Sequence, residues 1–95
     1  MYSVVQHYRG ATHLFDLLEA RREEVQELMG SIPGFVAFYC VRTSNGGVAV
    51  TVCQDRAGGE ESTRRAADWI RVNLPAAAAH PPEIMEGEVI IQRVK

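Results

Sequence analysis

The order of segments in this chain of 95 residues predicts a ferredoxin-like α+β fold (βαββαβ): a four-stranded antiparallel sheet with two helices on one face. Three observations predict it. β-Rich runs lie near both ends, two more are joined through Asn45 and Gly46, and the segments between them carry apolar residues at helical spacing. The six segments use nearly the whole chain, so we expect residues 1–95 to form a single domain.

The first strand is predicted over residues 2–8, and Gly10 then allows the chain to turn. One helix follows, with Thr12 as its expected N-cap and a stop at Gly30 and Pro33. Its apolar stripe consists of Leu14, Leu17, Leu18, Val25, Leu28 and Met29.

Residues 35–43 and 47–54 form the predicted central hairpin, because Asn-Gly between two β-rich runs is a strong hairpin signal. With Asn45 and Gly46 as the loop, Tyr39 opposes Val52 and Cys40 opposes Thr51. One face then carries Phe35, Ala37, Tyr39, Val41, Val48, Val50 and Val52. The other carries Val36, Phe38, Cys40, Ala49, Thr51 and Cys53. Both faces are apolar enough to be buried.

The two cysteines, Cys40 and Cys53, lack metal-type spacing and are expected to be reduced. In the register above they are diagonal neighbours. Only a loop shifted to Gly46 and Gly47 would place them opposite each other, where a disulfide could be considered.

The second helix is predicted to begin after Asp55 or near Gly59 and to end before Pro75. Its inner stripe is Ala66, Trp69, Ile70, Asn73 and Leu74. Residues 75–82 cross back, and residues 84–94 form the last strand, with Gly87 as a bulge or close-approach point. Two helices cover only one face of four strands, so the second apolar face predicts a homodimer.

Composition and absent motifs exclude several function classes. The net charge of -2 and the interspersed charges do not favour nucleic-acid or membrane-surface binding. The start has no signal-peptide pattern and no run is long enough to span a membrane, so a cytoplasmic location is expected. No metal site is predicted, and hydrolase, zinc-protease, nucleotide-binding and metallochaperone motifs are all missing.

The scaffold motifs resemble a known family along essentially the whole chain. They are Ile32-Pro-Gly-Phe35, the apolar run ending at Asp55, Ala66-Ala-Asp-Trp69 and Gly87-Glu-Val. In these motifs the chain resembles the dimeric α/β-barrel proteins of the antibiotic biosynthesis monooxygenase type. The resemblance implies two subunits that press their open sheet faces into a barrel. It also implies a pocket between sheet and helices for a small hydrophobic, aromatic or polyketide-like ligand, which some members oxidise without a cofactor.

A haem-degrading branch of the family implies a second reading, in which haem would be the ligand. That branch has an Asn in the first strand, a Trp in the second helix and an axial His soon afterwards. Trp69 matches the Trp and His80 falls near the axial position, whereas Gln6 replaces the Asn. Because of this departure and the intervening Pro75, we expect no cofactor, and an exposed loop histidine is the simpler reading of His80.

Further pocket candidates are His7, Arg42 and Asn73, which could form a polar cluster, and Tyr39, which could line a pocket or simply pack. Trp69 and Asn73 share one helical stripe and also have structural readings, as a core and a helix-end residue. No acid, base and nucleophile can be identified, so the catalytic residues are unknown. An oxygenase-like enzyme and a non-catalytic ligand-binding or regulatory homodimer both remain open.

Overall fold

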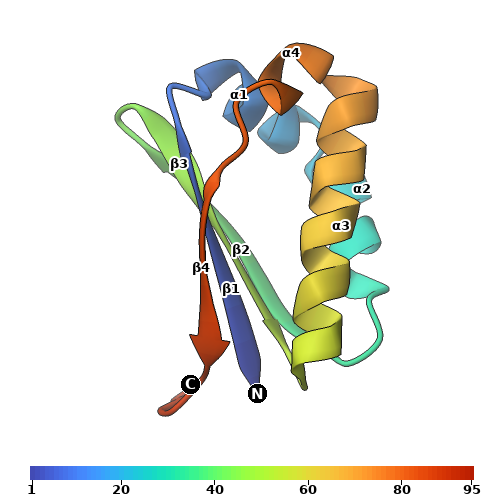
Figure 1. Cartoon of the computed structure of the whole chain (residues 1–95), viewed down its shortest axis with the longest axis vertical. Helices are drawn as coiled ribbons and strands as arrows, with labels where there is room; N and C mark the ends of the chain where they lie inside the picture. Colours follow the sequence, from blue (N-terminus) through green and yellow to red (C-terminus); the bar gives the residue numbers. More distant parts are fainter.

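The computed structural model describes all residues 1–95 and has four strands and four helices. In chain order they are β1 (Tyr2–Arg9), α1 (Thr12–Ala20), α2 (Arg22–Gly30), β2 (Phe35–Thr43), β3 (Gly46–Cys53), α3 (Arg56–Asn73), α4 (Pro75–Ala78) and β4 (Glu83–Glu88). The strands form one antiparallel sheet in the order β2-β3-β1-β4. Figure 1 shows the helices on one side of this sheet. The predicted ferredoxin-like α+β fold is therefore confirmed.

The hairpin register differs from the predicted one by two residues. Thr43 pairs with Gly46, so the loop is Ser44-Asn45, and Tyr39 opposes Val50 rather than Val52. Two glycines hold the strand in this register. A side chain on Gly46 would collide with the backbone of Tyr8, and one on Gly47 would collide with the ring of Phe15. Both glycines therefore allow close contacts, Gly46 with strand β1 and Gly47 with helix α1. Asn45 remains in the turn.

The register also separates the cysteines. Cys40 opposes Ala49 and Cys53 opposes Phe35, so the predicted diagonal contact between the two thiols is wrong. Both cysteines are free. A shift of two residues moves each side chain along its strand and keeps it on the same face, so the predicted division of the hairpin into two faces holds from Ala37 onward.

Phe35 is the exception to that division. The pairing of β2 with β3 is irregular between Phe35 and Ala37, which reverses the face on which Phe35 lies. Its ring packs with Val25, Met29, Ile32 and Cys53 on the helix side. The sequence pattern placed Phe35 on the opposite face, because strict alternation of side chains along a strand does not reveal a bulge.

The first predicted helix is in fact two, because the backbone of Arg21 leaves helical geometry (φ -115°, ψ 32°) between α1 and α2. The apolar periodicity continues through the break, so the sequence pattern did not reveal that the helix is interrupted at Arg21. Thr12 is the first helical residue and Ala11 occupies the N-cap, so α1 has no side-chain cap. The other termini agree with prediction: α2 ends at Gly30, and Asp55 caps α3 by accepting a hydrogen bond from the Gly58 N–H at 3.1 Å.

The last strand is shorter than predicted, since β4 ends at Glu88 instead of continuing to Val94. Tyr2 opposes Glu88, and the Val89 N–H still donates to the Met1 carbonyl, but residues beyond Val89 have no strand beside them. Ile90, Ile91 and Val94 consequently stay exposed, with relative exposures of 88%, 84% and 77%. Residues 75–78, predicted as part of a crossing loop, form the short helix α4 with Pro75 in its first turn.

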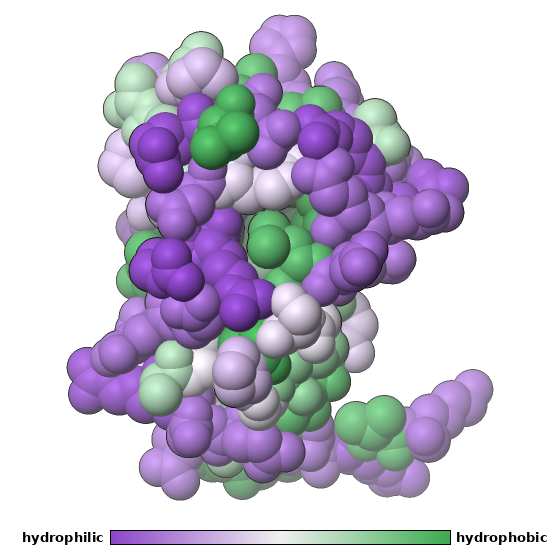
Figure 2. Space-filling view, turned by 90° about the vertical axis from the view of Figure 1, so that its right-hand side faces the viewer, coloured by the Kyte–Doolittle hydropathy of each residue, from purple (hydrophilic) through white to green (hydrophobic).

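The two faces of the sheet differ in what covers them. Val4, Tyr8, Ala49 and Cys53 point toward the helices and are buried. Figure 2, which looks onto the helix side, shows a mainly hydrophilic surface with hydrophobic residues in a central hollow. None of the helices is long and apolar enough to cross a membrane.

The opposite, uncovered side of the sheet is called the open face here. Side chains that point away from the helices line up across the strands, as in the row Tyr39, Val50, Val5 and Met85. The open face is formed by Ser3, Val5, His7, Ala37, Tyr39, Val41, Val48, Val50, Val52, Glu83 and Met85. Tyr39, Val41 and Met85 are more than half exposed in a single subunit.

Candidate functional site

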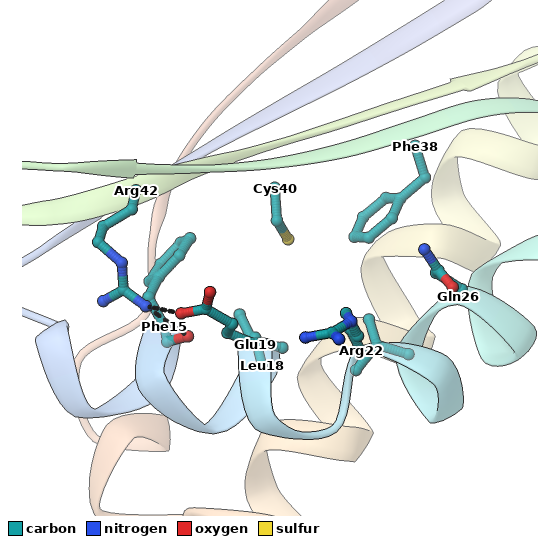
Figure 3. A pocket seen from close by; sticks show the side chains of 9 residues that line it. Phe15, Leu18, Glu19, Arg22, Gln26, Phe38, Cys40 and Arg42 are labelled. Carbon is teal, nitrogen blue, oxygen red and sulfur yellow. Dashed lines mark hydrogen bonds and ion pairs between the residues drawn. The ribbon is translucent and has the colours of Figure 1, made fainter.

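A cavity with a volume of about 300 Å³, called cavity 1 here, lies between the helix pair α1–α2 and strand β2. Its apolar walls come from both layers of the fold. Phe15, Leu18 and Val25 come from the helices, and Phe38 and Cys40 come from β2. Figure 3 shows the Phe38 ring and the Cys40 sulfur pointing from the strand into the space above the helices. A cavity of this size and lining suits a compact, largely apolar molecule.

Polar side chains border cavity 1 at two places. At one end, Arg42 forms ion pairs of 2.8 Å with Asp16 and 2.7 Å with Glu19, which neutralise it and tie β2 to α1. These carboxylates raise the pKa of Arg42 through hydrogen bonds, Asp16 first and Glu19 second. Arg22 and Gln26 of α2 border the other side and make no hydrogen bond or ion pair with the protein (Figure 3). They are therefore free to bind an anion or a carbonyl oxygen.

Cys40 stands at the centre of the strand wall of cavity 1. The residue lies on the edge strand β2 and is exposed in a single subunit, and its sulfur points into cavity 1 (Figure 3). Burial of the thiol raises its pKa to about 11 from the ordinary 9.0. At neutral pH the group is thus a neutral thiol, which packs against a ligand and does not act as a nucleophile.

Trp69 and Asn73 are joined to each other and to the break between α1 and α2. The Trp69 indole N–H donates to Glu24 at 2.7 Å, and the Arg21 guanidinium lies 5.3 Å from the indole centroid. Asn73 accepts a hydrogen bond of 2.5 Å from Arg21 and donates one of 2.9 Å to the Trp69 carbonyl. Both residues hold α3 against the helix pair, and neither lines cavity 1 or the two cavities described below.

The other predicted pocket residues are spread over the molecule. His7 and Tyr39 lie on the open face, where His7 pairs with Val48 and Glu83 across the sheet. His80 is exposed and borders a second cavity, beside α4. Arg42 borders cavity 1 and Asn73 caps the end of α3, so the structure does not bring His7, Arg42 and Asn73 into one cluster.

The residues named for the haem alternative are likewise apart. His80 borders the second cavity, of about 270 Å³, and Gln6 borders a third, of about 170 Å³, between β1, β4 and α3. Tyr8 and Ala77 line both cavities and stand between them. Trp69 borders neither of these two cavities.

Sequence reasoning missed most of cavity 1. Of its nine lining residues only Arg42 was predicted as a pocket residue; Phe15, Leu18, Arg22, Gln26 and Cys40 were not. A usable signal existed in the strand, since Phe38, Cys40 and Arg42 alternate onto one face. The helix side had no comparable signal, because the break at Arg21 turns α2 relative to α1 and so decides which residues meet the strand.

No family model and no curated protein matches the chain, but solved structures do. A mutant of MhuD with two manganese protoporphyrin IX molecules bound per active site has a TM-score of 0.72 at 15% identity, over 100% of both chains. A protein of unknown function from Nitrosomonas europaea has a TM-score of 0.71 at 17% identity, over 99% of this chain and 92% of the other.

A monooxygenase from Streptomyces coelicolor, in complex with nanaomycin D, has a TM-score of 0.63 at 17% identity, over 99% of this chain and 90% of the other. At such identities the similarity lies in the fold. The chain therefore has the ferredoxin-like fold of the antibiotic biosynthesis monooxygenase-type proteins that its scaffold motifs resemble.

Proposed function

We propose that this protein is a homodimeric small-molecule-binding protein of the antibiotic biosynthesis monooxygenase type, and that cavity 1 holds a compact aromatic molecule with an anionic or carbonyl oxygen. The observation that carries the proposal is the composition of the cavity: five apolar walls, two of them phenylalanines, and an unpaired Arg22 beside Gln26. Aromatic rings pack against Phe15 and Phe38 while the oxygen meets the guanidinium.

The chemistry that the chain itself supplies in cavity 1 is binding and orientation. Cys40 is neutral, and the Glu19 carboxylate is engaged by Arg42, so neither is a free base or nucleophile. Arg22 would stabilise the anionic form of a bound hydroxyaromatic acid, and the apolar walls would exclude water from the ring. Oxidation of such a ligand by dioxygen without an added cofactor is the enzymatic activity to test first. A binding-only regulatory role is the alternative.

The open face supports the proposed homodimer. A contiguous apolar surface of this kind marks an association site, and antiparallel sheets keep a second face apolar when something covers it. A second copy fits best, because every strand of the sheet contributes at least one apolar side chain to the face. The exposed Ile90, Ile91 and Val94 leave the sheet at the same end as the β1 terminus (Figure 1) and add apolar surface for the partner.

Isothermal titration calorimetry with 1-hydroxy-2-naphthoate tests the binding site. Arg22→Gln should weaken binding about tenfold, since it removes a charge-assisted hydrogen bond. Cys40→Phe should weaken it more, because the larger side chain fills the cavity. Arg71→Gln, an exposed arginine on α3 that lies outside cavity 1, is the matched control and should bind normally.

Oxygen consumption by the bound naphthoate, measured with an electrode in metal-free buffer, separates the two roles. Consumption that requires protein and is lost in Cys40→Phe supports the oxygenase. Binding without consumption supports the regulatory role. Affinity that neither Arg22→Gln nor Cys40→Phe alters would show that cavity 1 is not the site.

A further inference from the structure

The second cavity, called cavity 2 here, shares no lining residue with cavity 1 and differs from it in character. It lies where β1 turns into α1 and is closed by Leu74, α4 and His80. Its volume is about 270 Å³. Neighbouring residues of α1 face the two cavities, Leu14 toward cavity 2 and Phe15 toward cavity 1, so the helix separates them.

The walls of cavity 2 are mostly aliphatic. Leu14, Leu74, Ala76 and Ala77 line it, together with the ring of Tyr8. The Tyr8 hydroxyl is buried and donates to Gln6 at 2.9 Å, and burial raises its pKa, so the residue contributes a neutral ring and no free polar group. This lining suits an alkyl chain better than an extended aromatic system.

All charged or titratable side chains that border cavity 2, other than the neutral Tyr8, are basic: Arg9, His13 and His80. None of them forms an ion pair, and no carboxylate is among the lining residues. Six of the nine arginines form ion pairs with carboxylates, whereas Arg9, like Arg22 of cavity 1, forms none. The backbone N–H groups at the uncapped start of α1 lie at the same rim and add to its positive potential.

We propose that cavity 2 is a second binding site, and that it takes a short-chain aliphatic carboxylate. The alkyl chain packs against Leu14, Leu74 and Ala76, and the carboxylate meets Arg9, with His13 and His80 beside it. Burial of the chain supplies affinity, while the basic rim selects the acid over the corresponding alcohol. The site is independent of cavity 1, so each can be occupied or blocked alone.

Octanoate is the probe, titrated into uniformly labelled protein and followed by amide chemical shifts. The expected shifts are at Gly10, Ala11 and Ala77, with no saturable change at Phe38 or Cys40. Ala76→Leu should weaken binding at least tenfold by filling the cavity. Ala79→Leu, three residues along the chain and outside the lining, is the matched control and should leave affinity unchanged.

A comparison of octanoate with the corresponding alcohol tests whether cavity 2 selects a carboxylate. 1-Octanol should bind at least tenfold more weakly than octanoate, and the Arg9→Gln variant should reduce that difference, with the alcohol's affinity unchanged. Equal affinity for acid and alcohol, an unaltered octanoate affinity in Ala76→Leu, or shifts confined to cavity 1 would each overturn the assignment. None of these outcomes depends on whether the naphthoate binds in cavity 1.

Discussion

Gly47 of β3 lies directly against the ring of Phe15 of α1, so closely that a Cβ atom at position 47 would overlap the ring. The contact fixes the distance between helix and sheet at one end of cavity 1. It also orients Phe15, which packs edge to face on Tyr8 with ring centroids 5.8 Å apart and an interplanar angle of 67°. Because Gly47 has no side chain, the Phe15 ring can take this position in the wall of cavity 1.

Gly47→Ala should destabilise the fold by about 1–3 kcal/mol, because the added methyl group has to displace Phe15 or the strand. The shift in the urea unfolding midpoint measures this loss of stability. Gly30→Ala is the control: it lies at the end of α2 with nothing within 4 Å of an added Cβ, so it should be neutral or slightly stabilising. Equal midpoints for both variants would refute the contact.

Glu24→Gln should make stability less dependent on acid pH. The hydrogen bond from Trp69, followed by that from Arg21, lowers the pKa of the Glu24 carboxyl below its ordinary 4.5. Because the folded-state pKa is depressed, the stabilisation is fully present above pH 4.5 and is lost as pH falls through the lowered value. The variant should therefore be less stable than the unmodified protein at pH 7, and the two should converge in acid.

Urea unfolding at a series of pH values between 7 and 2 provides that comparison. Glu23→Gln on the same helix is the control, because Glu23 is exposed and makes no ion pair. If the difference in unfolding free energy between Glu24→Gln and the unmodified protein stayed constant in acid, the Glu24 carboxylate would not be stabilised by Trp69 and Arg21.

Val50→Lys should break the proposed homodimer, because Val50 lies in the middle of the open face between Val5 and Tyr39, where a partner would bury the charge. A monomer or an aggregate is expected in native mass spectrometry. Val72→Lys places the same charge on α3 at a valine that is 70% exposed, and it should leave the dimer intact. If Val50→Lys gave an equally stable dimer, the open face would not be the interface.

Cys40 should be alkylated slowly by iodoacetamide at pH 7.5 and faster as the pH rises toward 11, since the buried thiol has a pKa of about 11. Its thiolate fraction at neutral pH is roughly a hundredfold below that of an ordinary cysteine. Occupation of cavity 1 by 1-hydroxy-2-naphthoate should slow the reaction further. Rapid labelling of Cys40 at pH 7.5 would show that the thiol lies outside the apolar cavity.

Local patterns in the sequence were sufficient for the fold. Period-two alternation from Ala37 onward predicted the faces of the hairpin, and helical spacing with Asp55 and Gly30 at the boundaries predicted the helical segments. Two apolar faces predicted an uncovered side of the sheet, which the structure shows in the row from Tyr39 to Met85. Each of these features depends on neighbours a few residues apart, so local periodicity reveals them.

The tertiary structure alone decided the register, the helix break and the cavities. The hairpin loop moved to Ser44-Asn45 because Gly46 and Gly47 are needed against Tyr8 and Phe15, which lie far away in the sequence. Arg21 left the helix where it meets Trp69 and Asn73 of α3. Cavities 1 and 2 are spaces left between elements, so their walls combine residues from distant segments. Such spaces depend on how whole elements pack in three dimensions, and that packing leaves no periodic trace in the chain.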